Sequence, residues 1–164
     1  MPDLRPTQIE VYVFRRRGRG AEFLCLRRAA RSRLPGVWQP VTGKLRRGEG
    51  ALAGAAREVR EETGLEPRRW WALEDVALYF DAQAGVARVL AKFAAEVGGR
   101  DRVTISREHT AAAFLGAPEA GRRFLWEAQR RGLRSVRREV LRRGPLARAL
   151  EIRDSRKGSA KHPR

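Results

Sequence analysis

Hydrophobic and polar positions change their spacing along the chain, and the spacing predicts where strands and helices lie. Residues 8–16 (QIEVYVFRR) and 22–29 (EFLCLRRA) alternate loosely, are rich in Val, Tyr and Phe, and flank a turn that contains glycine. Such runs predict a pair of strands. The next segment, residues 36–43 (GVWQPVTG), is a short extended stretch that Pro40 interrupts and Gly43 ends.

Helical spacing follows directly. The segment from Glu49 to Thr63 contains no proline, and apolar residues recur in it three and four positions apart. These residues are Leu52, Ala55, Ala56 and Val59. The pattern predicts a helix with one apolar face, closed by Gly64.

The second half of the chain repeats the order of strands and then helix. Residues 70–97 predict two or three strands with a turn at 81–85, and one of the neighbours Trp70 and Trp71 should face inward and the other outward. Helices are predicted over Pro118–Arg131 and Leu133–Arg143. This order of elements predicts a mixed α/β domain built in layers.

Length and composition predict one domain and a tail. The chain has 164 residues, enough for one compact core. We expect the domain to span residues 1–145 and a basic, disordered tail to span 146–164, because the end of the chain has almost nothing to bury. No apolar run approaches the roughly 20 residues that cross a bilayer, and the first ten residues lack the order of a signal peptide. We therefore expect a cytoplasmic protein without membrane contact, in which the single Cys25 is a small buried hydrophobe.

The charge balance points to anionic partners. Lys and Arg outnumber Asp and Glu by 36 to 19, which gives a formal net charge of +17. Nucleotides, nucleic acids and acidic surfaces are the partners that such a charge attracts, although arginines can equally cover a solvated surface. Residues 122–164 alone hold 15 Lys and Arg against four Asp and Glu. Non-specific contact with nucleic acid through this basic C-terminal region is therefore one expectation.

Against this basic background, carboxylates gather on the first predicted helix. At about 100° per residue, Glu58, Glu61 and Glu62 share an arc of roughly 100° beside the apolar face. Like charges at this spacing repel, so a cation should offset them. Mg²⁺ prefers oxygen ligands and commonly shares its shell with substrate phosphates. A solvated, salt-bridged helix face is the structural alternative, and spacing alone leaves both open.

The full stretch from Gly43 to Leu65 resembles a known motif. Gly43 is followed after five residues by Glu49, and after seven more by the string REVREETGL. This order satisfies every fixed position of the Nudix box, G-x5-E-x7-R-E-U-x-E-E-x-G-U, where U is apolar. The predicted context, a glycine loop that leads into a helix, agrees. The chain therefore resembles the Nudix hydrolase family, which implies an α/β fold with a mixed β-sheet flanked by helices in an α/β/α sandwich.

The resemblance implies a metal site and a reaction. Glu58, Glu61 and Glu62 would bind Mg²⁺, or Mn²⁺ as a substitute, and the backbone carbonyl of Gly43 would add a ligand. The family hydrolyses a nucleoside diphosphate linked to another group. Bound cations would neutralise the phosphates and acidify a water, and a carboxylate would take the proton from that water.

Two further residues of the box have implied supporting roles. Glu49 would form a salt bridge with Arg57 and hold the glycine loop against the helix. Such a contact orients neighbouring metal ligands. We therefore count Glu49 and Arg57 with the catalytic residues.

Segments outside the box resemble one bacterial branch, which hydrolyses dihydroneopterin triphosphate and dATP. That branch has W-Q-x-V-T-G before the box and later an E-H pair that leads to an aromatic residue and L-x-A-P. The matching residues are Trp38, Gln39, Val41, Thr42 and Gly43, then Glu108, His109, Phe114, Leu115, Ala117 and Pro118. Glu108 would supplement the metal site from a separate loop. The implied reaction converts a nucleoside or pterin triphosphate to the monophosphate and pyrophosphate.

Other substrates and functions stay open beside this interpretation. The basic C-terminal region would suit an RNA 5′ end, although the segment before the box differs from W-Q-F-P-Q-G-G, which is typical of RNA pyrophosphohydrolases. Dinucleoside polyphosphates are a further alternative. An RNA-binding protein with a secondary hydrolase site belongs to a different class. The chain could be a monomer or a homodimer.

Four residues are candidates for substrate contact. Lys44 and Arg46, on the loop before the helix, could bind triphosphate oxygens, or they could simply be solvated. Trp38 could stack on a nucleobase or pack in the core. His109 could contact phosphate or assist proton transfer, or it could cap the element that follows.

Overall fold

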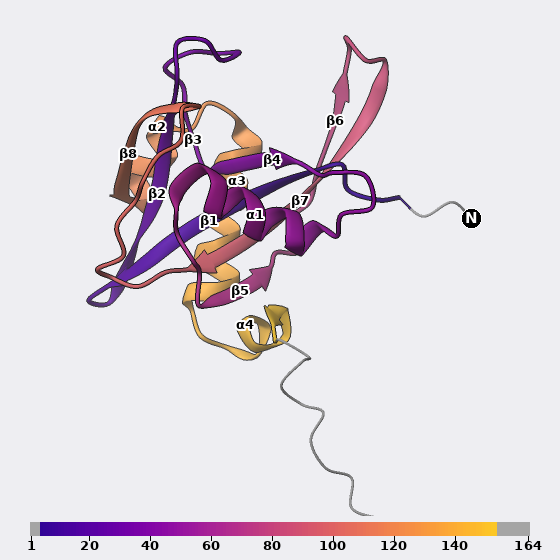
Figure 1. Ribbon diagram of the computed structural model, residues 1–164. Helices are drawn as coiled ribbons and strands as arrows, with labels where there is room; N and C mark the ends of the chain where they lie inside the picture. Colours follow the sequence, from indigo (N-terminus) through magenta and orange to yellow (C-terminus); the bar gives the residue numbers. More distant parts are fainter. Residues whose placement is uncertain (1–3, 154–164) are drawn as a thin grey trace, which may run out of the picture.

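The computed structural model describes residues 4–153 and shows a β-sheet with helices on both faces (Figure 1). Nine strands form the sheet within this range. They are β1 (Gln8–Arg17), β2 (Gly20–Arg28), β3 (Trp38–Gln39), β4 (Val41–Lys44), β5 (Arg69–Ala72), β6 (Ala77–Asp81), β7 (Val86–Glu96), β8 (His109–Gly116) and β9 (Glu151–Ile152). The helices are α1 (Ala51–Thr63), α2 (Ala117–Arg123), α3 (Glu127–Ser135), a π-helix (Val136–Leu141) and α4 (Pro145–Leu150).

Strand β1 lies at the centre of the sheet and makes it a mixed one. It pairs antiparallel with β2 and β4, and parallel with β7. Strands β5 and β6 both pair antiparallel with β7, at opposite ends of that long strand. The mixed α/β sandwich expected from the sequence is therefore confirmed.

Alternation along β1 builds two cores, one on each face of the sheet. Ile9, Val11 and Val13 are fully buried beneath α1, together with its residues Ala55 and Val59. The alternate residues of β1 face the helices near the C-terminus and pack in the second core. Burying one such side chain contributes about 1.5–3 kcal/mol, so both helical layers are held mainly by apolar contact.

The two neighbouring tryptophans of β5 illustrate the same alternation. Trp71 is 1% exposed and packs in the second core, whereas Trp70 packs from the edge of the first. They point to opposite faces of the sheet, as expected for consecutive residues of a strand. Helices cover both faces of the sheet, so Trp70 is also partly buried.

A buried polar cluster joins the second helical layer to the sheet. The Tyr12 hydroxyl bonds the carboxyl group of Glu10 and donates to the carbonyl of Gln129 on α3 at 2.9 Å. Lys92 of β7, whose side chain is fully buried, donates to Asp75 at 2.5 Å. Burial raises the pKa of Glu10, so its carboxyl group favours the protonated form.

Glycines flank helix α1 at both ends, Gly50 before it and Gly64 after it. The helix begins at Ala51, two residues after the predicted start, and ends at Thr63, with Gly64 as its C-cap. Gly64 has φ 68°, the left-handed conformation that glycine adopts most readily at the end of a helix. The predicted closure of this helix is confirmed.

The region after residue 108 differs from the sequence prediction in two ways. Strand β8 was not predicted, because its run HTAAAFLG is short of branched apolar residues, yet it pairs with β2 along most of its length. The helix predicted over Pro118–Arg131 is interrupted, because Phe124 is extended and buried between α2 and α3. The second predicted helix instead continues α3 as the π-helix.

The predicted boundary of the domain at residue 145 also needs correction. Residues 145–152 form α4 and β9, and β9 pairs with Trp70 and Trp71 of β5. Glu151 also accepts a hydrogen bond from Arg69 at 2.8 Å. The sheet edge thus orders the beginning of the supposed tail, and residues 154–164 lie outside the described range. Within residues 4–153 no helix combines the length and the apolar character needed to cross a membrane.

Candidate active site

The close approach of β4 to α1 positions the site, and it depends on Gly43. A Cβ atom at this position would overlap the carboxylate of Glu58. Any residue larger than glycine would therefore displace that carboxylate or push the helix from the sheet. The small space beside Glu58 thus explains why the first position of the motif is glycine.

Arg57 ties the glycine-rich loop to α1. Its guanidinium donates two hydrogen bonds to Glu49, at 2.8 and 2.9 Å, and one to the carbonyl of Lys44 at 3.1 Å. The remaining nitrogen bonds Glu58 at 2.7 Å and Glu61 at 3.0 Å. The hydrogen bonds from Arg57, and one from the backbone N–H of Arg46, lower the pKa of Glu49 to about 2. The structure thus contains the salt bridge that the resemblance implies.

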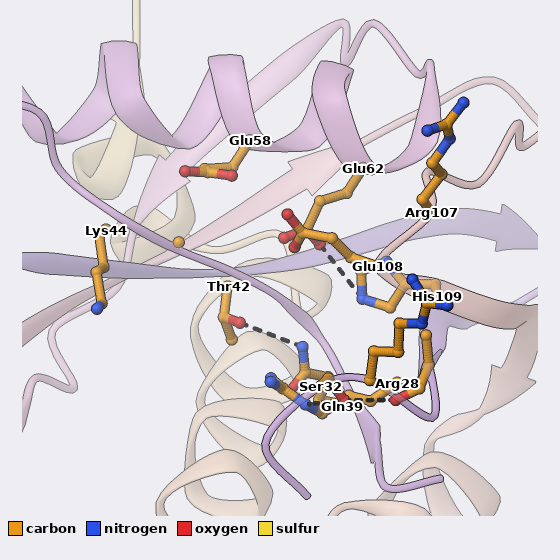
Figure 2. Close-up of a pocket in the computed structure, with 13 residues that line it drawn as sticks. Arg28, Ser32, Gln39, Thr42, Lys44, Glu58, Glu62, Arg107, Glu108 and His109 are labelled. Atoms are coloured by element: carbon orange, nitrogen blue, oxygen red, sulfur yellow. Dashed lines mark hydrogen bonds and ion pairs between the residues drawn. The ribbon is translucent and has the colours of Figure 1, made fainter. Parts of the chain in front are cut away.

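Next to the Arg57 hydrogen bonds lies a cavity of about 530 Å³, which is lined by residues from several elements (Figure 2). Helix α1 contributes carboxylates, the ends of β2 and β4 contribute polar and basic groups, and the start of β8 contributes a third wall. Its lining residues are Arg28, Ala29, Arg31, Ser32, Gln39, Thr42, Gly43, Lys44, Glu58, Glu62, Arg107, Glu108 and His109. Carboxylates and cations therefore face one another across a single pocket.

The carboxylate of Glu62 is the most unusual group in this pocket. It is 4% exposed, and its Oε2 atom has no hydrogen-bond partner among the described residues. Burial, followed by repulsion from Glu58 and Glu108, raises the pKa of Glu62 to about 9. Burial also raises the pKa of Glu58. Glu62 is thus stabilised as an anion only if a positive charge is supplied, whereas Glu58 already pairs with Arg57.

The donors fit a divalent cation, although they are not gathered around one point. Among the described residues, no three His, Cys, Asp or Glu side chains stand close enough to hold an ion. The nearby guanidinium of Arg57 instead pairs with Glu58 and Glu61. Hard oxygen donors and an unpaired buried carboxylate oxygen on Glu62 are what Mg²⁺ or Mn²⁺ would bind.

Glu61 and Arg46 lie apart from the pocket. The Glu61 side chain is 49% exposed and pairs with Arg57 and with Arg46, the latter at 3.1 Å. Neither Glu61 nor Arg46 lines the cavity. Of the three glutamates that share the helix arc, the structure therefore brings Glu58 and Glu62 into the pocket and leaves the third at its edge.

His109 does line the cavity, from the first position of β8. It is buried, and its Nε2 atom lies 3.8 Å from Oε2 of Glu62. Burial is the largest cause that lowers its pKa, so the imidazole is neutral near pH 7. Glu108, directly before it, lies at the open side of the same pocket.

Sequence reasoning missed Arg28, which forms the cationic wall. Its guanidinium bonds the Ser32 hydroxyl at 3.3 Å and the Gln39 side chain at 3.1 Å, and Gln39 in turn donates to Thr42 at 3.2 Å. Arg28 follows Leu24 and Leu26 on the same face of β2. That alternation was a usable signal, because it directs the side chain toward the helix that bears the glutamates.

Trp38 lies away from the cavity. It packs at the edge of the second core, and the guanidinium of Arg123 stacks over its ring at 4.6 Å. Lys44 and His109 are thus the two candidate substrate contacts that the structure places at the pocket, whereas Trp38 and Arg46 are elsewhere.

Comparison with known proteins identifies the family of the chain. The family model described as the NUDIX domain matches residues 6–139. The chain belongs to the Nudix family. It is accordingly a Nudix hydrolase, an enzyme that acts on pyrophosphate bonds, and members of this family generally use divalent metals, mostly Mg²⁺.

Solved structures share the Nudix fold of this chain. A protein of Listeria monocytogenes assigned to the NUDIX hydrolases has a TM-score of 0.71 and 22% identity, covering 82% of this chain and 94% of that one. An Ap4A hydrolase of C. elegans gives 0.67 and 22%, covering 80% and 94%. The dihydroneopterin triphosphate pyrophosphohydrolase of E. coli gives 0.63 and 24%, covering 79% and 92%. These likenesses establish the fold and not the substrate.

One curated protein shares a shorter region. The octanoyltransferase of Myxococcus xanthus is 44% identical over 64 residues, which are 39% of this chain. The same region is only 17% of the octanoyltransferase. The match therefore spans less than a fifth of that protein.

Proposed function

We propose that this Nudix hydrolase is a divalent-cation-dependent pyrophosphohydrolase that converts a nucleoside or pterin triphosphate to the monophosphate and pyrophosphate. The observation that carries the proposal is the unpartnered, buried carboxylate oxygen of Glu62 in a pocket that also holds Arg28 and Lys44. A buried anion needs a cation, and a polyphosphate needs cations on more than one side. In this pocket Glu62 could bind a metal cation, and Arg28 and Lys44 could bind phosphate oxygens.

The metal would be held by groups that the motif and the pocket share. They are the carbonyl of Gly43 and the carboxylates of Glu58, Glu61, Glu62 and Glu108. Mg²⁺, or Mn²⁺ in its place, supplies neutralisation of phosphate charge and acidifies water when bound. Glu61 belongs to this set through the motif alone, since its side chain does not line the pocket.

The protein's own groups then divide the remaining work. Arg57 makes two hydrogen bonds to Glu49 that do not involve Glu58, so the loop would stay attached to α1 if Glu58 bound the metal. Arg28 is held in place by Ser32 and Gln39, which lets it bind phosphate oxygens with little loss of side-chain entropy. Glu108 is exposed on the loop opposite the helix, where it can accept a proton from water.

Two segments outside the box support the triphosphate branch. Gln39 and Thr42, from the segment WQPVTG, lie in the pocket wall, and so do Glu108 and His109 from the E-H pair. The fold of the E. coli dihydroneopterin triphosphate pyrophosphohydrolase is similar over 79% of the chain. Substrates of this class occur in the cytoplasm, where we propose that the protein acts.

A substrate panel tests the proposal. The full chain is incubated with Mg²⁺ and separately with dATP, the other nucleoside triphosphates, dihydroneopterin triphosphate, Ap4A, ADP-ribose and a 5′-triphosphorylated RNA, and the products are separated. We expect the fastest turnover for a mononucleoside or pterin triphosphate, with pyrophosphate as the product. Turnover of Ap4A or RNA without turnover of any free triphosphate would contradict the proposed substrate class.

A second candidate function rests on the basic helices at the C-terminal side. Arg137, Arg142, Arg143 and Arg148 are exposed, and none pairs with a described carboxylate. We propose that this surface contacts nucleic acid non-specifically. Binding of a single-stranded RNA should fall steeply with salt, and replacing Arg142 and Arg143 by Ser should reduce the salt slope by about 1–2 units without changing hydrolysis. Binding that ignores salt would contradict this function.

A further inference from the structure

Exposed apolar side chains are concentrated in the hairpin formed by β6 and the first half of β7. Ten large apolar side chains are exposed among the described residues, and half of them lie between residues 76 and 86. They are Val76 (50% exposed), Leu78 (66%), Tyr79 (41%), Phe80 (70%) and Val86 (42%). A patch of this kind on an otherwise polar molecule commonly marks a protein interface.

The hairpin also presents an open strand edge. Among the described residues, β6 pairs only with β7, and in Figure 1 the hairpin projects from the body of the domain. The register sets Leu78 opposite Val89 and Phe80 opposite Ala87, so these four side chains share one face. The outer edge of β6 thus has free backbone donors and acceptors beside an apolar face.

The usual features that protect an edge strand are missing from β6. Its sequence, ALYFD, contains neither lysine nor proline, and its pairing with β7 has no register shift. The one charged residue, Asp81, forms an ion pair with Arg88 across the hairpin at 3.1 Å. The edge is therefore free to pair with another strand.

Charge indicates which partner fits. The whole chain carries +17, so most of its surface repels a second copy of itself. The hairpin from residue 76 to residue 89 contains one acidic and one basic residue, and these neutralise each other. It is thus a neutral, apolar region where two copies can meet with less charge repulsion than elsewhere on the surface.

We propose that β6 pairs antiparallel with β6 of a second copy of this chain, about a two-fold axis beside Tyr79. This register places Leu78 opposite Phe80 of the second copy, and each Phe80 opposite the other Leu78. A two-fold interface is self-complementary, and apolar cross-strand pairs stabilise antiparallel strands. The two sheets become continuous, and no residue of β6 lines the active-site pocket.

Sedimentation velocity of the full chain tests the proposal. We expect a dimer at concentrations from about 1 to about 100 µM, and a larger dimer fraction at high salt, because salt screens the repulsion between the basic copies. Phe80→Arg should give a monomer. The matched control Leu125→Arg adds the same charge at an exposed leucine on the loop between α2 and α3, and it should remain dimeric.

Three outcomes of that experiment would overturn the proposal, and two of them do not depend on salt. One is a wild-type chain that is monomeric over the whole range. The other is a dimer that persists in Phe80→Arg while both variants unfold at the wild-type temperature, since the copies would then meet elsewhere. Dissociation at high salt would point to bridging by nucleic acid and would equally contradict an apolar interface.

A cross-linking experiment tests the register without relying on loss of a dimer. The only native cysteine, Cys25, is buried, so an added surface cysteine reports alone. Under mild oxidation, Tyr79→Cys should form a disulfide between copies, because residues facing each other across the axis lie within bridging distance. Gln83→Cys, in the exposed turn of the same hairpin, should not. Equal cross-linking of both variants, or none in Tyr79→Cys, would contradict the register and its axis.

Discussion

At the scale of single residues, the site depends on two positions, Arg57 and Gly43, that other residue types would not fit. Arg57 bonds five oxygen atoms on four residues, and only its planar, forked guanidinium could do so. Gly43 has no side chain because the Glu58 carboxylate lies where a Cβ would stand. The contacts of both residues predict how substitutions change the stability of the fold.

Replacing Gly43 by alanine should disturb both stability and activity. The added methyl group overlaps the end of the Glu58 side chain, so this carboxylate must turn away from Arg57 or β4 and α1 must move apart. The cost is about 1 kcal/mol if only the side chain turns and up to about 3 kcal/mol if the backbone shifts. We expect a matching decrease in the free energy of unfolding measured by urea denaturation. Gly99→Ala is the matched control, because a Cβ there meets no atom within 4 Å. Equal stability of the two variants would contradict the steric role of Gly43.

The ion pair between Glu49 and Arg57 predicts a pH dependence of stability. The folded pKa of Glu49, about 2, lies below its ordinary value of 4.5, so the pair stabilises the fold fully above pH 4.5. That contribution should be lost progressively as pH falls from 4.5 toward 2. Glu49→Gln should therefore lower the free energy of unfolding at about pH 6 and change it much less at about pH 2, where the contribution is lost.

Urea denaturation at the two pH values measures this difference. Glu66→Gln serves as the control, since Glu66 pairs with Arg60 at the exposed end of α1 and lies outside the Arg57 network. An equal loss in Glu49→Gln at both pH values would show that the carboxylate's charge is not what stabilises the loop.

At the scale of elements, α4 and β9 extend the domain beyond its expected end. Leu150 packs at the edge of the second core, whereas Leu146 on the same helix is 38% exposed. Leu150→Ala should lower the free energy of unfolding by roughly 1–2 kcal/mol, and Leu146→Ala by less than about 0.5 kcal/mol. Denaturant titration checks both. If neither variant is destabilised, the docking of α4 contributes nothing to stability.

The elements that the sequence predicted well are those with a strong period. Alternation in β1 and β2, and the predicted apolar positions Leu52, Ala55 and Val59 of α1, specify which side chains enter the core. Strand β8 was missed because alanines carry little signal, and its pairing with β2 is a contact between distant segments. Phe124 interrupts the predicted helix for a similar reason, since it is drawn into a core that the local sequence does not reveal.

The site could be predicted in part for the same physical reasons. Residues that belong to one motif, such as Glu58 and Glu62, are placed by a single helix and can be located from spacing. Arg28 comes from another strand and meets them only through sheet topology. The separation of Glu61 and Trp38 from the cavity likewise depends on neighbours, Arg57 and Arg123, whose positions the fold determines.

At the scale of the whole molecule, charge is distributed unevenly and each region has a distinct use. The chain is strongly basic overall, yet four carboxylates of α1 and its preceding loop gather beside one pocket. The hairpin of β6 and β7 is neutral and apolar, while the C-terminal helices expose unpaired arginines. The basic surface would raise the local concentration of an anionic substrate, and the pocket would then fix its phosphates.

The buried carboxylate of Glu62 is the central element of the proposed function, and an isosteric change tests it directly. Initial rates of pyrophosphate release are measured for wild type, Glu62→Gln and the control Glu66→Gln, on the best triphosphate and over a range of Mg²⁺ concentrations. We expect Glu62→Gln to lose roughly 100-fold or more in rate at every Mg²⁺ concentration, with the control within about two-fold of wild type. A Glu62→Gln enzyme with the wild-type rate and Mg²⁺ dependence would contradict the account.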